Sequence, residues 1–441
     1  MHVSGIVLIL IALGTPFIWF STVGAGHDQI ALFSQYTGIL ALISMSIGQL
    51  IATRARLVEW VFGGLDRSYV VHKWLGVSAM GLLLIHDTVD AEMSKLGRQN
   101  ILEEFAETLG ELSLYGLIIL VVISVATFIP YHLWKWTHRI MGAFFVAGAL
   151  HYLLILKPFR NGDPLGIYVS VFCVVGVLAF TWRLLPAGMR PSRNYSIASI
   201  EKTGNATAVS IAPNGRKLRH RAGQFVFVSF AGQEPHPFSI SSAPRDDGRI
   251  RISAAKLGDY TADLDRKITV GMNARIEGPF GHFERYKPTR PQLWIAGGIG
   301  ITPFVAWAQA LDESDAPVHL VYCMKSRASA AHLDELEVLA KVKPNLTLHV
   351  FETSKEGRAN AEKIIQRTGQ DPAGLVVSFC GPRRMRETLK AEFSIKGIRG
   401  RNFRFEEFEI RSGVGLRRLA EVVLNKSMSK LAKAETNHAK T

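Results

Sequence analysis

Six long apolar runs occupy the first 185 residues of the chain, and no other feature restricts the fold as strongly. An α-helix needs about 20 residues to cross the hydrocarbon core of a bilayer, and each run is close to that length. The first run lacks the cationic start of a signal peptide, so we expect an uncleaved span. The sequence therefore predicts six membrane-spanning helices, at residues 3–22, 30–52, 69–89, 112–129, 133–156 and 164–182.

Lysine and arginine in the short loops predict the orientation, because basic residues are enriched in cytoplasmic loops. With the N-terminus inside, the inner side carries Arg54, Arg56, Arg67, Lys73, Lys135, Arg139, Arg183, Arg190 and Arg193. The outer side carries only Lys95, Arg98, Lys157 and Arg160. We therefore expect a multi-pass protein of a bacterial inner membrane, with its N- and C-termini in the cytoplasm.

The composition indicates a chain with two different halves. Apolar residues make up 48% of the 441 residues and charged residues 20%, an average that fits neither a membrane protein nor a soluble one. The net charge of +14 favours contact with an anionic membrane surface. No basic stretch alternates with aromatics as in single-strand binders, so we expect no nucleic-acid partner. Three cysteines are too few for a disulfide framework or a metal cluster.

Four histidines fall inside the predicted spans, His72 and His86 in the third, His138 and His151 in the fifth. Ionisable side chains there are costly and usually functional. A structural role, as a hydrogen-bonded imidazole in the core, would explain a single histidine. It is a poor explanation for four histidines that are paired on two helices. Both spans run in the same direction, so the histidines form two levels, separated by ~21 Å at ~1.5 Å per residue. Imidazole is a common axial haem ligand, so the pattern predicts two bis-histidine haems.

The spacing in the fifth span is less regular than in the third. His72 and His86 are nearly four helical turns apart and share a face. His138 and His151 are about 140° apart on a straight helix of ~3.6 residues per turn. Either this helix is locally distorted near Gly142 or Gly148, or the haems approach it from different sides.

The soluble half changes its pattern at Gln292. Before it, short alternating runs such as "GQFVFVSF" predict an antiparallel barrel. After it, strands such as "QLWIAGG" alternate with helical stretches, which predicts a doubly wound parallel sheet. In "IAGGIGITPF" the glycines let backbone amides approach a pyrophosphate at a helix N-terminus. We expect Thr302 to cap that helix and Pro303 to lie in its first turn.

Taken in order, these motifs resemble the ferric reductase and NADPH oxidase family over residues 1 to about 411. The resemblance implies a multi-domain fold: a six-helix transmembrane haem bundle, a β-barrel FAD domain and a doubly wound α/β NAD(P)H domain. The domains would cover residues 1–190, 191–290 and 291–411, with a basic amphipathic tail at 412–441 that has no assigned role. In this family the four histidines ligate two stacked b-type haems, which pairs His72 with His138 and His86 with His151.

The flavin and nucleotide sites are implied by the same resemblance. Two segments, "HPFSISSAP" and "KLGDYTADL", resemble the family's isoalloxazine and pyrophosphate segments. The implied FAD contacts are His236, Pro237, Phe238, Ser239 and Ser242 in the first segment and Lys256, Gly258, Tyr260 and Thr261 in the second. The motif "EGPFG" resembles the loop that closes the barrel. The nucleotide contacts are Gly297, Gly298, Gly300, Thr302, Pro303, Cys380, Gly381 and Pro382.

Three further assignments concern the chemistry around the nicotinamide. Cys380 in "FCGP" borders the nicotinamide in similar flavoproteins, and Phe408 is our choice for the aromatic that stacks on the flavin, with Phe405 as the alternative. These two positions, Cys380 and Phe408, are the expected catalytic residues. Lys325 and Arg327 follow a strand and could bind an adenosine 2′-phosphate, which would favour NADPH over NADH. Lys325 and Arg327 are explained equally well as ordinary basic residues on the surface.

The expected function is a transmembrane oxidoreductase. Electrons would pass from cytoplasmic NAD(P)H through FAD and two haems to an acceptor outside. Oxygen, reduced to superoxide, is the first choice of acceptor and a ferric chelate the second. A different class of function is an electron-transfer subunit that serves a periplasmic or membrane partner, although no obligate protein partner is evident. No EF-hand loop is present, so we expect no built-in calcium control.

Overall fold

The structure is a computed structural model that describes residues 3–23, 28–89, 101–125, 129–186, 189–256, 259–285 and 291–406. Its contacts divide the chain into two compact units. The first contains the apolar helices up to Leu185. The second contains Gly64–Asp66 and the chain from Pro186, with two β-sheets.

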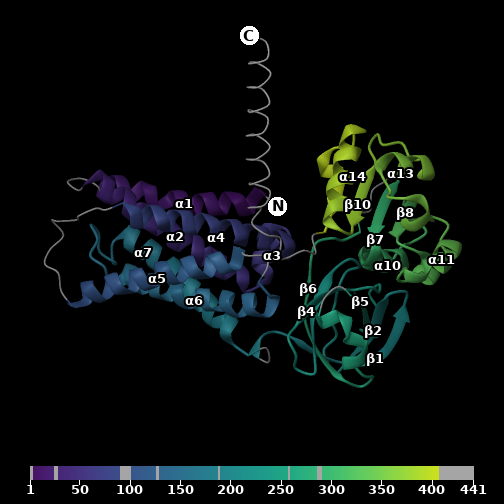
Figure 1. The fold of residues 1–441 in the computed structure, drawn as a ribbon, viewed down its shortest axis with the longest axis horizontal. Coiled ribbons are helices and arrows are strands. Elements are labelled where there is room, and N and C mark those ends of the chain that lie inside the picture. Colours follow the sequence, from purple (N-terminus) through teal and green to yellow (C-terminus); the bar gives the residue numbers. More distant parts are fainter. Residues whose placement is uncertain are drawn as a thin grey trace, which may run out of the picture. The chain divides into compact units, whose positions relative to one another are not determined.

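Each predicted apolar run forms a helix in the first unit (Figure 1). The six long helices are α1 (Val3–Val23), α2 (Gln29–Ala52), α4 (Leu65–Thr88), α5 (Ile101–Val125), α6 (Tyr131–Leu154) and α7 (Pro164–Leu184). A short helix, α3 (Arg56–Phe62), was not predicted. α5 begins before the predicted residue 112, and Glu103 and Glu104 in its first turn favour a helix N-terminus. The prediction of six long helices is confirmed.

Five of these helices are long and apolar enough to cross a membrane, among the residues that the structure describes: α1, α2, α4, α5 and α7. α6 has 24 residues, as many as α4, but it carries Lys135, Arg139 and three histidines. On its outward faces the bundle exposes Ile119, Val122 and Leu178. Exposed apolar surface of this kind suits contact with lipid.

The second unit begins with an antiparallel sheet whose strand order is β4-β3-β6-β1-β2-β5. Its strands are β1 (Arg193–Thr203), β2 (Ala206–Pro213), β3 (Phe225–Phe230), β4 (His236–Ser239), β5 (Ile250–Ala255) and β6 (Asn273–Phe280). A bridge between Ile240 and Ile252 joins its two edges. Two short helices, α8 (Asp259–Ala262) and α9 (Leu264–Lys267), lie between β5 and β6 in the chain. The predicted barrel is confirmed.

A parallel sheet follows, with the strand order β11-β10-β7-β8-β9. Its strands are β7 (Gln292–Gly297), β8 (Val318–Met324), β9 (Leu346–Glu352), β10 (Val376–Cys380) and β11 (Phe403–Phe405). The longer helices between them are α10 (Thr302–Gln309), α11 (Leu333–Val342), α13 (Ala361–Thr368) and α14 (Arg383–Ile395). The short ones are η2 (Gly298–Ile301), η3 (Arg327–Ser329), α12 (Thr353–Glu356) and η4 (Gly400–Asn402). The order reverses beside β7, and ligands of such sheets bind where the order reverses, at the carboxyl ends of the strands.

The barrel and the parallel sheet are joined by a polar seam. His332 precedes α11, and its Nε2 lies 2.8 Å from Ser253 Oγ on β5, while its Nδ1 lies 2.9 Å from Glu335 Oε2. Arg251 of β5 also pairs with Glu335, at 3.0 Å. Although burial raises the pKa of Glu335, the hydrogen bonds and charges of His332 and Arg251 lower it to about 2. Glu335 is therefore ionised at neutral pH and links the two domains.

Candidate functional site

Two histidine pairs lie between α4 and α6. The rings of His72 and His138 have centroids 5.9 Å apart, with an angle of 66° between their planes. His86 and His151 are close enough to interact electrostatically. The structure thus brings together the residues that the sequence paired. Among the described residues no group of three or more His, Cys, Asp or Glu side chains gathers as a metal site, so each pair stands as two imidazoles only.

Every Nδ1 in these pairs has a partner on a third or fourth helix. On α2, His72 Nδ1 lies 3.0 Å from the carbonyl oxygen of Gly48, and His86 Nδ1 lies 2.8 Å from that of Ser34. On α5, His151 Nδ1 lies 2.7 Å from the carbonyl oxygen of Ala106. The fourth contact, at 3.2 Å, joins His138 Nδ1 to Ser124 Oγ. A carbonyl oxygen only accepts, so the three carbonyl contacts fix the tautomer of His72, His86 and His151 and leave their Nε2 for a metal. The Ser124 hydroxyl can donate or accept, and it occupies Nδ1 of His138 without fixing its tautomer. This arrangement fits axial ligands of haem iron.

Glycines provide the space behind three of the rings. A Cβ on Gly110 would lie 2.8 Å from His151 Nδ1, and one on Gly38 would lie 3.2 Å from the ring of His86. A Cβ on Gly48 would lie 3.6 Å from His72 Nδ1. Because these glycines belong to α2 and α5, the sequence around the histidines gave no signal for them. Gly110 and Gly38 therefore let a neighbouring helix come close enough to bond the imidazole, whereas a Cβ on Gly48 would make an ordinary van der Waals contact.

The irregular spacing on α6 does not break that helix, which runs without interruption from Tyr131 to Leu154. Both of its histidines bond to α5, while both histidines of α4 bond to α2. Gly142 packs against the ring of Phe180, and Gly148 packs against Ser113. α6 is therefore not broken near either glycine, and both of its histidines contact α5 in spite of their irregular spacing.

The predicted flavin segment forms β4, which pairs with β3. Along it, Phe238 and Ser239 are buried, His236 is half-buried and Pro237 is exposed. The imidazole of His236 stacks on Tyr260, with ring centroids 3.6 Å apart. The structure therefore brings residues of the first and second predicted flavin segments into contact.

The second flavin segment lies at the end of β5. Lys256 is exposed and pairs with Asp265 at 3.6 Å, Thr261 lies in α8, and Gly258 falls outside the described residues. Burial raises the pKa of Tyr260. Its hydroxyl is buried without a hydrogen-bond partner among the described residues. A buried hydroxyl without a partner is costly, and the polar edge of a bound flavin would satisfy it.

Ser242 is separated from this group. Its hydroxyl accepts a hydrogen bond from the backbone N–H of Arg251 at 3.0 Å, and it lines a different cavity, described below. Its predicted contact with FAD stays a prediction, which the position of its hydroxyl does not favour.

The glycine-rich turn follows β7 directly. Gly297 ends the strand, and Gly298 has the left-handed φ of +55° that an L side chain rarely adopts. A Cβ on Gly300 would lie 2.3 Å from the carbonyl oxygen of Cys380, so only glycine lets this turn pass the end of β10. Gly381 and Pro382 also pack on Gly297. The two nucleotide motifs therefore meet at the carboxyl ends of adjacent strands, where the strand order reverses.

The expected cap of the following helix is wrong in detail. Thr302 is the first residue of α10, and its hydroxyl donates to the carbonyl oxygen of Ile299 at 2.6 Å instead of accepting from a backbone N–H. A short 3₁₀ turn, Gly298–Ile301, precedes the helix and takes up the bonds that a cap would make. Pro303 lies in the first turn, as predicted.

A buried acid lies beside the nicotinamide motif. Cys380 is fully buried, and burial, with a further contribution from the Glu406 carboxyl, raises its thiol pKa. Glu406 is 5% exposed, burial raises its pKa, and its Oε2 has no partner among the described residues. Sequence reasoning missed Glu406 because it weighed only the aromatics of "NFRFEEFEIR". A buried thiol and a buried carboxyl, both with raised pKa values, thus border the crevice.

The other predictions around the nucleotide have mixed outcomes. Phe408 lies outside the described residues, while Phe405 packs under the guanidinium of Arg386, 4.5 Å from the ring centroid. Arg327 forms an ion pair with Glu337 of α11, whereas Lys325 is exposed at the end of β8. Of the two basic residues, Lys325 is the better placed to meet a phosphate.

Three family descriptions match successive parts of the chain. A ferric reductase like transmembrane component matches residues 37–149, an FAD-binding domain matches 192–298, and an oxidoreductase NAD-binding domain matches 294–391. Together and in this order, the three matches fit the ferric reductase and NADPH oxidase layout that the sequence resembles. The chain is a multi-pass membrane protein with FAD- and NAD(P)H-binding domains.

Curated relatives of this ferric reductase-like chain match its soluble half. The toluate 1,2-dioxygenase electron transfer component of Pseudomonas putida is 26% identical over 48% of the chain. The carnitine monooxygenase reductase subunit of Escherichia coli is 28% identical over 46%. The matches cover 66% and 64% of these relatives' own lengths.

Solved structures are similar at lower identity. The flavohem-like FAD/NAD-binding domain of nitric oxide dioxygenase from Vibrio cholerae is 20% identical, with a TM-score of 0.44, over 50% of this chain and 99% of that one. Flavohemoglobin from Malassezia yamatoensis is 15% identical, with a TM-score of 0.48, over 88% of this chain and 98% of that one.

Proposed function

We propose that this protein carries electrons across a bacterial inner membrane, from cytoplasmic NAD(P)H through FAD and two b-type haems to an acceptor on the outer side. The observation that carries the proposal is the arrangement of the histidines. His72 with His138, and His86 with His151, join α4 to α6 at two levels. Each Nδ1 is held by α2 or α5, which leaves every Nε2 for iron.

FAD, when bound, takes electrons from NAD(P)H in pairs and releases them singly, as one-electron haem chemistry requires. The chain supplies the geometry. Gly297, Gly298 and Gly300 let backbone amides approach the pyrophosphate, and β4 offers the polar edge for the flavin. Cys380 and Glu406 are buried, which keeps water away from the crevice and raises the pKa of both groups. Phe408 is proposed to stack on the flavin.

The bundle residues tune the haem potential. A hydrogen bond from an axial imidazole to a backbone carbonyl raises the basicity of the ligating nitrogen and lowers the reduction potential of the iron. Three of the four imidazoles contact carbonyl oxygens, whereas His138 contacts a hydroxyl. No general acid or base is required in the bundle, because only electrons cross it.

Molecular oxygen, reduced to superoxide, is the proposed acceptor. The test uses the purified full chain with NADPH, in two matched assays. Cytochrome c reduction that superoxide dismutase inhibits should account for the NADPH consumed in air. Faster reduction of ferric citrate under anaerobiosis than consumption of oxygen in air would instead assign a ferric chelate reductase.

The ferric alternative has one specific residue to test. The sequence offers Lys157 and Arg160 as attractors of an anionic chelate. Lys157 Nζ donates to the carbonyl oxygen of Tyr152 at 2.7 Å and lies over the Tyr152 ring, so it caps the end of α6. Arg160 is exposed. A chelate reductase should therefore lose affinity for ferric citrate in Arg160→Ala, while an oxidase should not change.

A third reading makes the chain an electron-transfer subunit for a periplasmic or membrane partner. One relative is named the electron transfer component of toluate 1,2-dioxygenase and another the reductase subunit of carnitine monooxygenase, and these names support this alternative. It predicts haem reduction by NADPH, but negligible turnover with either oxygen or ferric citrate in the purified chain.

The orientation has its own test. Nine basic residues on one side of the spans against four on the other favour a cytoplasmic soluble half. In sealed inverted vesicles added NADPH should then be consumed at once, and in right-side-out vesicles only after permeabilisation. The opposite pattern would reverse the topology.

A further inference from the structure

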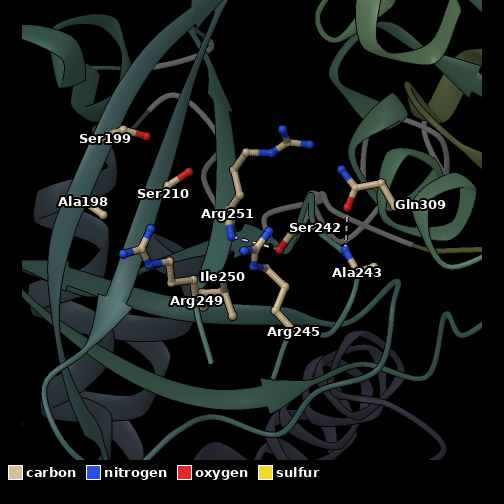
Figure 2. Close-up of a pocket in the computed structure, with 10 residues that line it drawn as sticks. All are labelled: Ala198, Ser199, Ser210, Ser242, Ala243, Arg245, Arg249, Ile250, Arg251 and Gln309. Carbon is tan, nitrogen blue, oxygen red and sulfur yellow. Dashed lines mark hydrogen bonds between the residues drawn. The ribbon is translucent and has the colours of Figure 1, made fainter. Parts of the chain in front are cut away.

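A cavity of about 360 Å³ opens on the barrel at its seam with the nucleotide domain (Figure 2). Three arginines line it: Arg245, Arg249 and Arg251. Figure 2 shows Ser199 and Ser210 on one side of these arginines and Gln309 on the other. The function proposed above uses none of these side chains.

The strand register explains why polar side chains gather here. Ser199 pairs with Ser210, and Ser210 pairs with Arg251, across the adjacent strands β1, β2 and β5. Residues directly opposite each other in an antiparallel sheet project from the same face. The neighbours of Arg251 on β5, Ile250 and Ile252, are buried in the barrel core. The row of two serines and one arginine therefore faces outward.

The cavity adjoins the end of the first predicted flavin segment, because Ser242 and Ala243 line it, but it lies away from the second flavin segment and from the glycine-rich turn. Arg251 lies at the start of β5, whereas Lys256 of the flavin segment follows its end. Gln309 ends α10, whereas the glycine-rich turn precedes its start. The cavity is thus at the opposite end of β5 from the second flavin segment, and at the opposite end of α10 from the glycine-rich turn.

Positive charge exceeds negative charge around the cavity. Arg245 pairs with Asp247 at 3.0 Å, and Arg249 Nε lies 3.8 Å from the same carboxylate. Arg251 pairs with Glu335 at 3.0 Å. Three guanidinium groups thus share two carboxylates. The planar fork of arginine matches phosphate oxygens, and serine hydroxyls can donate to them as well.

We propose that this cavity binds a soluble anion that carries phosphoryl groups, held by Arg245, Arg249 and Arg251. Its volume is in the range of small-molecule sites of about 300–1,000 Å³ and admits a phosphate with an attached group. The occupant would contact both domains. Gln309 Oε1 accepts from the backbone N–H of Ala243 on the barrel side, at 2.8 Å, and its Nε2 donates to Glu335 at 2.5 Å.

The test is calorimetric titration of the purified full-length holoprotein with inorganic pyrophosphate. Saturating NADP⁺ is present, so that the dinucleotide site is occupied. We expect one pyrophosphate per chain and a loss of at least about tenfold in affinity in Arg249→Ala. The Arg249 side chain is 56% exposed and, among the described residues, its one ion pair is the long contact with Asp247, so its replacement should leave the fold and the FAD content intact. Arg216→Ala is the matched control, because Arg216 is exposed on the same barrel and does not line the cavity.

Three results would overturn the proposal. They are no binding at millimolar pyrophosphate, the same loss in Arg216→Ala as in Arg249→Ala, and several weak sites per chain. The last two would indicate diffuse attraction to a basic surface. The source of the phosphate is tested in nanodiscs. If phosphatidic acid in the disc weakens pyrophosphate binding only in proteins that contain Arg249, the natural ligand is a lipid headgroup. If phosphatidic acid has no effect on pyrophosphate binding, the natural ligand is soluble.

Discussion

The four membrane histidines show how much of the site depends on single atoms. In each of them Nδ1 is engaged by another helix, so only Nε2 remains for a metal. An imidazole whose tautomer is fixed in this way is a preorganised ligand, because no reorientation is needed when iron binds. Losing one ring should therefore remove one haem and leave the rest of the protein intact.

His86→Ala tests this at the His86–His151 pair. We expect the haem to FAD ratio to fall from two to one, with the flavin spectrum unchanged, and reduction of the external acceptor by NADPH to fall to background. His132→Ala is the control, because His132 is an exposed imidazole of α6 outside the pairs. Loss of both haems, or of neither, would show that the pairs are assigned wrongly.

Glu406 gives a prediction about pH. Burial raises its pKa in the folded protein above the ordinary 4.5 of glutamate. The cost of ionising it is therefore absent below about pH 4.5, grows as the pH rises, and is complete above the folded pKa. Glu406→Gln removes that cost, so the midpoint of thermal FAD release should rise at pH 7 and stay unchanged at pH 4. A gain of equal size at both values would mean that the carboxyl is not protonated in the folded state.

Lys325 determines the coenzyme preference if the 2′-phosphate contact is correct. Lys325→Ala should raise KM for NADPH by about tenfold, since a charge-assisted bond to phosphate is lost. KM for NADH should not change, and this assay is the internal control. An equal rise for both coenzymes would mean that Lys325 contacts a part that both share.

The sequence alone could predict some of these site residues but not others. The histidines and glycines were recognisable because their residue types are unusual where they stand, in a membrane span or in a turn. Glu406 was missed because a glutamate near a strand end is common, and only its burial beside Cys380 makes it exceptional. The ion pair of Arg327 with Glu337 could not be predicted, because Glu337 lies on another element, and the phosphate contact of Arg327 stays a prediction.

At the scale of helices and strands, close packing determines whether the histidines are held. α5 approaches α6 at Gly110, where a Cβ would lie 2.8 Å from His151 Nδ1. Gly110→Ala must push the helix or the ring away, at a cost of about 1–3 kcal/mol for overpacking. We expect a weakened or altered haem at the His86–His151 pair and an unchanged His72–His138 haem.

Gly14→Ala is the control for that variant, because a Cβ on Gly14 of α1 would meet nothing within 4 Å. Alanine is a better helix former than glycine, so this control should be neutral or slightly stabilising. Electron paramagnetic resonance of the ferric protein separates the two haem signals. Equal effects of both variants on both signals would mean that the change acts through general bundle stability.

The elements themselves were predictable where a pattern is long. Runs of about 20 apolar residues located every long helix, and alternation located the barrel strands. α3, with seven residues, and β11, with three, are too short to show a period. The partners of the histidines on α2 and α5 were not predictable, because they depend on which helices pack together and on carbonyl groups that every residue carries.

At the scale of the whole molecule, the order of the domains was the most predictable feature. The membrane histidines, the flavin segments and the glycine-rich turn are each moderately specific. Their order in one chain is highly specific, because a nucleotide domain would supply electrons to a flavin and the flavin would supply them to the haems. The arginine-lined cavity was not predictable, because its walls come from β1, β2, the loop before β5 and the end of α10. Only the folded register brings those side chains together.

The central claim is that one chain joins NAD(P)H oxidation to two bis-histidine haems. It is tested most directly by the absorption spectrum of the purified full chain, before and after anaerobic addition of NADPH, with haem and flavin quantified in the same sample. The account predicts low-spin haem at two per flavin, both reduced by NADPH. High-spin haem, a ratio of one or less, or haem that NADPH leaves oxidised while the flavin is reduced would contradict it.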